Sequence, residues 1–412
     1  MVESRDRRTV MRGVSARSAS RGRTSGRRHG LRVYGLRAVV ALAIAGLLFL
    51  VIEGFCGTVV VVQEFFKRSH WVTTAQAHLT YDPGLGWVSL PNLSLENLFG
   101  PGVFLKTNTQ GFRNEETLSV EVPPGRCRVL CSGDSFTFGY GVANDHTWCH
   151  RLGVIDPRLE PVNMGQGAYG VDQSFLWYLR DGQVLDHDVH LFAFIAHDFE
   201  RMKHDNYAGY GKPVLAINGG ELVTKNVPVP RVRPRLTHNV NVLKHALKQF
   251  RSVSFLRTMV RQHVLQHASA MASDDHPEDH PMEDIVSKVF ETLHEINRAK
   301  GSTLVLVFLP TSADYRGAES DHWRGYVHAE SARQGIAFID VVEAFKTLPP
   351  SEVERLFIPE GAMDPLGLAS HYTVAGNEYV AQTLYQRLTS RPEVRAKLSA
   401  SEARTRLRGA SP

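Results

Sequence analysis

Short apolar runs alternate with longer amphipathic stretches over most of the chain beyond residue 126. Runs of this kind, bounded by polar or turn-forming residues, are typical of strands that are buried on both faces of a parallel sheet. Because strand and helix patterns alternate, the sequence predicts a doubly wound α/β domain with five parallel strands. We expect strands at 128–131, 161–163, 190–196, 303–310 and 336–341, and helices at 171–183, 237–266, 282–300, 322–334 and 373–388.

The other segments are polar or rich in Gly and Pro and are expected to lie outside this sheet. Residues 63–122 predict a connector followed, from residue 81, by a small β module with turns. Residues 203–235 predict an inserted surface loop, residues 271–284 a polar linker, and residues 391–412 a flexible tail. The α/β domain itself is expected to span residues 123–390.

Residues 38–62 are strongly apolar and contain one charged residue, Glu53. As a helix this segment would be about 37 Å long, enough to cross the roughly 30 Å hydrocarbon layer of a membrane. Residues 1–37 hold 11 Arg, no Lys and only two acidic residues. By the positive-inside rule, this pattern predicts a basic cytoplasmic tail, a single helix through the cytoplasmic membrane, and an extracytoplasmic body. A cleaved signal peptide, with Arg27-Arg28 as a faint twin-arginine signal, and a buried core helix are the alternatives.

The formal net charge of +5 is concentrated in this tail, which contributes +9, whereas the rest of the chain holds 36 Lys and Arg against 40 Asp and Glu. A body with this balance does not predict a nucleic-acid partner. Four Cys do not make a disulfide framework. We expect Cys127, Cys131 and Cys149 as buried thiols, with one disulfide among them as the alternative for an extracytoplasmic body. No zinc spacing, glycine fingerprint or P-loop is present in the sequence, so no cofactor is expected.

The segment SGDSFTFG (132–139) directly follows the first predicted strand. Ser135 is therefore expected in a loop at the carboxyl end of a strand, the edge at which doubly wound sheets bind ligands. Gly133 permits a tight turn there, and the helix that follows can direct backbone N–H groups at an anion. Asp134 is expected to hold the loop by hydrogen bonds. A Gly-Asp-Ser triplet on its own more often marks an ordinary turn.

A second segment, HYTVAGN (371–377), opens the last helix of the predicted sheet domain. In a doubly wound sheet its loop can reach the same edge as the loop of Ser135, although the two are 236 residues apart. A hydroxyl becomes a good nucleophile when a neighbouring imidazole takes its proton, so Ser135 and His371 form a candidate nucleophile–base pair. By itself, His371 would be interpreted as a helix cap or a surface residue.

With both segments in view, the chain resembles the GDSL/SGNH hydrolase superfamily, in particular its membrane-anchored bacterial members, over about residues 78–390. The resemblance implies a three-layer α/β/α, flavodoxin-like fold, with Ser135 as the nucleophile and His371 as the general base. The block VNMGQGAYGVDQ (162–173) resembles the one that supplies a backbone oxyanion donor. That donor falls on Ala168, and the N–H of Ser135 is the other.

Two positions depart from the family pattern. Where the family has an Asn side chain in the oxyanion hole, this chain has His197, which can donate through its ring or be a structural histidine. Where the family places the triad acid, two or three residues before the base, this chain has Leu368 and Ala369. Asp364 is the nearest upstream carboxylate and the candidate acid, whereas Asp340 is a remote candidate expected to cap a turn. A Ser–His dyad and a loss of activity are the alternatives.

The resemblance implies a serine esterase or acyl hydrolase that acts on ester-linked acyl groups, with small-molecule esters or those of envelope polysaccharide or lipid as substrates. One alternative is transfer of the acyl group to a sugar hydroxyl, as in membrane-anchored relatives that acetylate exopolysaccharide. The other is a noncatalytic envelope protein that keeps the fold. The changes at His197 and at residues 368–369 favour the latter, and the presence of Ser135 and His371 opposes it.

Overall fold

The computed structural model describes residues 34, 36–49, 51, 54–55, 77–207, 210–231, 280–359 and 369–409. The chain divides into two units, residues 1–62 with 246–262, and residues 63–245 with 263–412. In the first unit, residues 36–49 are helical. Among the described residues no helix is both long and apolar enough to cross a membrane, so the transmembrane helix predicted at 38–62 is not supported. The helix predicted at 237–266 lies outside the described residues.

The second unit contains the predicted five-stranded parallel sheet. Its strands are β5 (Cys127–Gly133), β6 (Leu159–Gly165), β7 (Val189–Phe194), β12 (Thr303–Phe308) and β13 (Ala337–Asp340). They lie in the order β13-β12-β7-β5-β6, and every neighbouring pair is parallel. From the β6 edge, this is the order 2-1-3-4-5 of flavodoxin-like sheets. The predicted doubly wound architecture is therefore confirmed for this unit.

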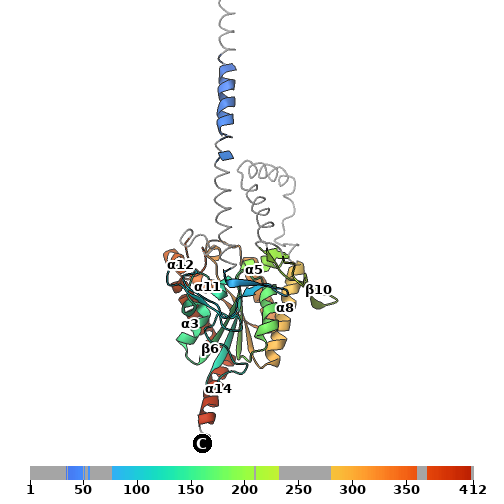
Figure 1. Cartoon of the computed structure of the whole chain (residues 1–412), viewed down its shortest axis with the longest axis vertical. Helices are drawn as coiled ribbons and strands as arrows, with labels where there is room; N and C mark the ends of the chain where they lie inside the picture. The colour runs from blue at the N-terminus through green and yellow to red at the C-terminus, as the bar shows by residue number, and fades with distance from the viewer. Residues whose placement is uncertain are drawn as a thin grey trace, which may run out of the picture. The chain divides into compact units, whose positions relative to one another are not determined.

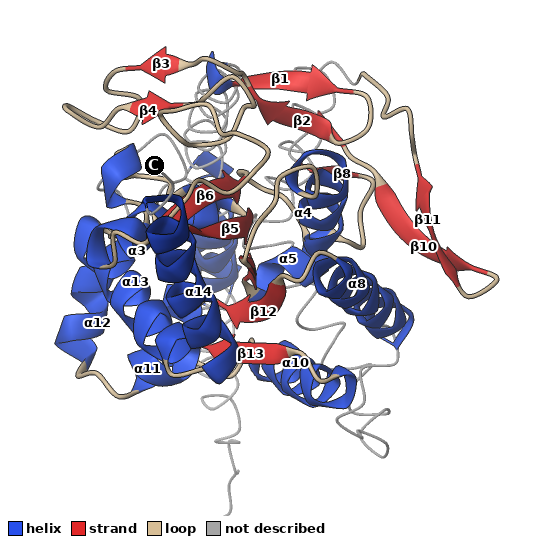
Figure 2. Cartoon of the chain, turned by 90° about the horizontal axis from the view of Figure 1, so that it is seen from below, coloured by secondary structure: helices blue, strands red, loops and turns tan. Residues whose placement is uncertain are grey.

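Helices cover both faces of the sheet, as Figure 1 and Figure 2 show. One face carries α3 (Trp148–Ile155), α11 (Val342–Lys346), α12 (Pro350–Leu356), α13 (Val374–Thr389) and α14 (Pro392–Gly409). The other face carries α4 (Val171–Trp177), α5 (Ala196–Arg201), α8 (His280–Ala299) and α10 (Asp321–Gln334). The short helices α2 (Ser135–Phe138) and α9 (Ser312–Arg316) follow β5 and β12. The helices predicted around 171–183, 282–300, 322–334 and 373–388 are confirmed.

Side chains along each strand alternate between two buried clusters, because successive residues of a strand point to opposite faces. In β12, Leu304, Leu306 and Phe308 belong to the cluster shared with α4, α8 and α10. Val305 and Val307 belong to the cluster shared with α3 and α13. Because both faces are covered, both sets of positions are apolar, and this produces the continuous apolar runs in the sequence.

The small strands before the sheet pack against the loops at its carboxyl edge. They are β1 (Leu79–Asp82), β2 (Gly86–Ser89), β3 (Ser94–Leu95) and β4 (Leu105–Lys106), paired β1 with β2 and β3 with β4. The Trp87 indole donates to the Gly167 carbonyl at 2.9 Å, and the Tyr169 hydroxyl donates to the Trp87 carbonyl at 2.5 Å. Residues within the predicted β module thus support the loop that carries Ala168.

The segment predicted as a surface loop at 203–235 contains four strands. They are β8 (Asn206–Tyr207), β9 (Tyr210–Gly211), β10 (Val214–Asn218) and β11 (Glu221–Lys225). The β10–β11 hairpin turns at Gly219-Gly220, both with positive φ, a conformation that glycine adopts readily. Lys212 is fully buried and pairs with the buried carboxylate of Asp172. This ion pair attaches the inserted segment to the sheet domain.

Two further segments predicted without regular structure form helices. Within residues 391–412, predicted as a flexible tail, α14 buries Val394 and Leu398 in the cluster that contains α13. Burial of this apolar surface holds an otherwise charged segment as a helix. The predicted linker at 271–284 ends in α8, which begins at His280 with Pro281 in its first turn, where proline is tolerated. Residues 271–279 lie outside the described part of the chain.

Candidate active site

Ser135 is the first residue of α2, directly beyond the carboxyl end of β5. Gly133 makes this tight exit possible, because a Cβ there would lie 2.7 Å from the carbonyl oxygen of Ala193 and would overlap Thr137. Asp134 caps α2: its Oδ1 accepts from the Phe136 N–H at 2.8 Å. The loop is therefore held by Asp134, as predicted.

His371 lies just before α13 and reaches the hydroxyl of Ser135. The distance between His371 Nε2 and Ser135 Oγ is 2.8 Å, across 236 residues of sequence. The backbone around His371 is fixed by a hydrogen bond of 2.7 Å from Ile358 N–H to the His371 carbonyl. Thr373 caps α13 by accepting from the Gly376 N–H at 3.1 Å. The two loops thus meet at the carboxyl edge of the sheet.

Trp148, at the start of α3, links the segment of Ser135 to α13, the helix that follows His371. Its indole N–H donates to the Phe136 carbonyl at 3.1 Å, and its backbone N–H donates to Asn377 Oδ1 at 3.0 Å. Phe136 in turn stacks on the His371 ring, with 4.6 Å between the ring centroids. One buried tryptophan therefore touches both segments that carry the Ser–His pair.

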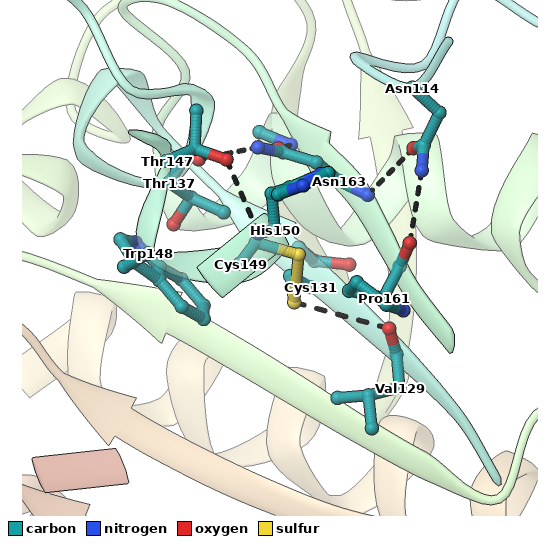
Figure 3. Close-up of a disulfide and its surroundings, with 12 residues drawn as sticks. Asn114, Val129, Cys131, Thr137, Thr147, Trp148, Cys149, His150, Pro161 and Asn163 are labelled. Atoms are coloured by element: carbon teal, nitrogen blue, oxygen red, sulfur yellow. Dashed lines mark hydrogen bonds between the residues drawn. A yellow bond between two sulfur atoms is a disulfide. The ribbon is translucent and has the colours of Figure 1, made fainter. Parts of the chain in front are cut away.

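A disulfide joins Cys131 of β5 to Cys149 of α3, as Figure 3 shows, with the two Cα atoms 6.4 Å apart. The expectation of buried thiols is wrong for these two residues, and Cys127 is buried. Cys131 lies four residues before Ser135, and Cys149 follows Trp148. The bond therefore fixes the start of α3 against the strand that leads to the nucleophile.

Ala168 lies in the loop after β6 and has a positive φ of 64°. Such a backbone is strained for a residue with a Cβ. Within the described part of the chain, no group accepts a hydrogen bond from the N–H of Ala168 or from that of Ser135. Unpaired backbone donors are what an oxyanion hole supplies, and the oxyanion role of both N–H groups stays a prediction.

A buried charge cluster that the sequence pattern does not predict connects three of these loops. Arg201 Nη1 donates to Asp134 Oδ2 at 3.2 Å, to Asp198 Oδ1 at 2.5 Å and to the Tyr169 carbonyl at 2.9 Å. One cation cannot fully offset two buried carboxylates, and burial raises the pKa of Asp198 well above its usual value. The Asp198–Arg201 spacing of three residues on a helix is the one sequence signal that could have indicated this pair.

His197, the predicted side-chain donor of the oxyanion hole, lies in the first turn of α5. It is exposed at the start of α5 and lines a cavity of about 510 Å³ together with residues of α5, α9 and α10, including Asp314 and Trp323. No hydrogen bond joins it to Ser135, Ala168 or His371 in the residues that the structure describes. The predicted oxyanion role of His197 therefore gains no support from the geometry.

The candidate acid Asp364 falls within 360–368, outside the described residues, and its role stays a prediction. Asp340, the remote candidate, accepts from the Val342 N–H at 2.9 Å and binds Arg324. It therefore caps a turn, as expected. In the described ranges, no three of His, Cys, Asp and Glu are grouped so that they could hold a metal ion.

No family model and no curated protein sequence matches this chain. Solved structures with a similar fold include a member of the lipolytic G-D-S-L family from Veillonella parvula, at 13% identity and a TM-score of 0.33, covering 63% of this chain and 97% of that one. A lipase/acylhydrolase from Enterococcus faecalis matches at 10% identity and a TM-score of 0.34, over 64% and 96%. A catalytic mutant of an acetylxylan esterase from Geobacillus stearothermophilus matches at 12% identity and 0.35, over 65% and 95%. Similarity at this level does not establish a family or an activity for this chain.

Proposed function

We propose that this protein is a serine esterase of the SGNH type, which hydrolyses ester-linked acyl groups with Ser135 as nucleophile and His371 as general base. The observation that carries the proposal is the 2.8 Å separation of Ser135 Oγ and His371 Nε2. This is hydrogen-bond distance, the geometry that proton transfer from a nucleophilic hydroxyl requires. The pair lies where loops at the carboxyl edge of a doubly wound sheet converge.

The proposed reaction proceeds in two halves. In the first, Ser135 Oγ bonds to the acyl carbon, the carbonyl electron pair moves onto oxygen, and the hydroxyl proton passes to His371 Nε2. Collapse of this tetrahedral intermediate expels the alcohol, which takes the proton from His371. In the second half, water attacks the acyl-enzyme with His371 again as base, and the carboxylic acid leaves as Ser135 regains its proton.

The negative oxygen of each intermediate is stabilised by backbone donors. Ser135 offers the N–H at the start of α2, and Ala168 offers the N–H of the loop after β6. Both are preorganised by bonds to the scaffold, because Asp134 caps α2 and the Trp87 indole binds the carbonyl of Gly167, next to Ala168. Removal of one donor of this kind typically costs about 10²–10³ in rate.

Glycan or lipid esters are the proposed natural substrates, and a small acyl ester is the appropriate probe. Ser135 is only 5% exposed, so its access favours a compact acyl group. We expect hydrolysis of p-nitrophenyl acetate by the wild-type protein. Ser135→Ala should reduce the rate to background, and His371→Ala should reduce kcat by about 10²–10⁴-fold.

Ser132 and His190 provide a matched control. Ser132 Oγ lies 2.9 Å from His190 Nε2, a separation close to that of the proposed pair, but both residues are fully buried inside the sheet domain. Ser132→Ala therefore removes a histidine-bonded hydroxyl without touching the site, and its kcat should stay near the wild-type value. Hydrolysis that survives Ser135→Ala would overturn the proposed function.

A further inference from the structure

Tyr140 lies between the proposed base and the proposed oxyanion loop. It follows Gly139, the C-cap of α2, and its N–H donates to the Ser135 carbonyl at 3.2 Å. Its ring centroid is 5.5 Å from that of His371. The sequence pattern does not single out this residue, although it stands only five positions after Ser135.

The hydroxyl of Tyr140 contacts the loop that carries the second backbone donor. A Cβ built on Gly167 would overlap this hydroxyl and would lie 2.6 Å from the Tyr140 Cζ. Only glycine leaves room for the phenol at this position. Gly167 directly precedes Ala168, so the hydroxyl contacts the residue next to the one whose N–H is proposed to bind the oxyanion.

The proton of this hydroxyl is weakly engaged within the protein. Among the described residues, the polar group within reach of Tyr140 Oη is His78 Nε2 at 3.4 Å, a long distance for a hydrogen bond. Burial raises the pKa of Tyr140 above its usual range, because the phenolate would be poorly solvated. The phenol therefore stays protonated at neutral pH, and toward an anion it acts as a hydrogen-bond donor.

We infer that Tyr140 is a further catalytic residue, whose hydroxyl donates a third hydrogen bond to the oxyanion formed when Ser135 attacks the ester. Tyr140 keeps its proton throughout, so the steps proposed above balance unchanged. This inference rests on the proposed function. It supplies a side-chain donor beside the two backbone N–H groups of the proposed oxyanion hole.

His78 acts as a positioning residue for this tyrosine. It lies just before β1, in a segment that the sequence predicts to be a connector, and it is almost fully buried. Besides its contact with the hydroxyl, its ring meets that of Tyr140 edge-on, with the centroids 6.2 Å apart. The region before the sheet therefore contributes to the active site and not only to its support.

The test is Tyr140→Phe, which removes the hydroxyl and keeps the ring. An oxyanion donor acts only in the transition state, so kcat for p-nitrophenyl acetate should fall by about 10²-fold with KM unchanged. The affinity for a small alkyl boronic acid, which forms a tetrahedral adduct with the serine, should fall by a similar factor. Tyr326→Phe is the matched control, because its hydroxyl bonds the Glu283 carbonyl between α10 and α8. That variant should keep the wild-type kcat.

The outcomes separate this inference from the proposed function. If Ser135→Ala abolishes hydrolysis but Tyr140→Phe keeps kcat within threefold of wild type, or raises KM alone, the role of Tyr140 is overturned and the proposed function stands. If Ser135→Ala leaves hydrolysis intact, both fail. If Tyr140→Phe does not fold, kcat is measured instead with a monofluorinated tyrosine at position 140, and this variant tests the role of Tyr140. It is a stronger donor of the same shape, and a tenfold loss of kcat would refute the inference.

Discussion

Replacement of Arg201 by Met tests the energetic account of the buried charge cluster. The side chain of Arg201 is 9% exposed, and those of Asp134 and Asp198 are 0% and 2% exposed. Methionine leaves both carboxylates in the protein interior without the guanidinium between them. Loss of one partner from a buried ion pair costs about 3–5 kcal/mol, and we expect the free energy of unfolding to fall by this amount at neutral pH.

The pH dependence gives this prediction a sign. Burial raises the folded-state pKa of Asp198 above its ordinary value of 3.8. Above that pH the folded protein binds more protons than the unfolded chain, so this group lowers stability as pH rises, until the folded pKa is passed. Without Arg201 the folded-state pKa of Asp198 rises further, so the pH range over which Asp198 lowers stability extends to higher pH. The destabilisation should therefore be larger at pH 8 than at pH 5, by up to about 1.4 kcal/mol per pH unit.

The assay is urea unfolding at both pH values, followed by tryptophan fluorescence. Arg180→Met is the matched control, because Arg180 also binds two carboxylates, Asp82 and Asp181, at 2.6 Å, but its side chain is 42% exposed. Exposed pairs contribute about 0–1 kcal/mol. If Arg201→Met were no more destabilising than this control, or if its effect shrank as pH rose, the account of the cluster would be refuted.

Three further predictions concern stability. Burial lowers the pKa of both His187 and His190 below 6.5. The unfolded chain therefore takes up protons first, and below that pH each of the two should lower the free energy of unfolding by up to about 1.4 kcal/mol per pH unit. In acid urea titrations His190→Gln should show a slope smaller than that of the wild type by up to this amount, and an equal slope would contradict the prediction. Ala168→Gly should raise the free energy of unfolding by about 1 kcal/mol, because glycine removes the strain of the left-handed backbone, and Ala168→Val should lower it. A Gly variant less stable than the Val variant would show that the backbone of residue 168 is not strained. Joint replacement of Cys131 and Cys149 by Ala should lower the free energy of unfolding by about 3 kcal/mol, as expected for a crosslink across 18 residues. In the denatured but unreduced wild-type protein, a thiol-alkylating reagent should leave both cysteines unmodified. Modification of either one would exclude the disulfide.

The sheet could be predicted from sequence because its pattern is simple. Strands buried on both faces need apolar residues at consecutive positions, and runs such as 303–308 are typical of them. The elements that were missed are held by few tertiary contacts. α14 is charged along most of its length and is secured by side chains such as Val394 and Leu398, which propensity alone does not distinguish from a tail. Gly219-Gly220 is a typical turn pair of a β-hairpin, but the many Gly and Pro residues of segment 203–235 favoured the prediction of a surface loop.

The residues of the candidate site also differ in how far the sequence alone predicts them. Ser135 and His371 could be predicted because each lies in a recognisable segment next to a regular element. Tyr140 and Arg201 could not, because their roles depend on neighbours that are distant in sequence, Gly167 and His78 for the first and Asp134 for the second. His197 is exposed at the start of α5, and its part in the oxyanion hole stays a prediction.

The most direct measurement is labelling with a fluorophosphonate, followed by mass mapping of the modified peptide. This reagent phosphonylates a serine whose hydroxyl is activated by a neighbouring base. The account predicts a single label on Ser135 in the wild-type protein, with labelling at least 100-fold slower after His371→Ala. An unlabelled, folded wild-type protein, a label on another residue, or an unchanged rate in the His371 variant would contradict it.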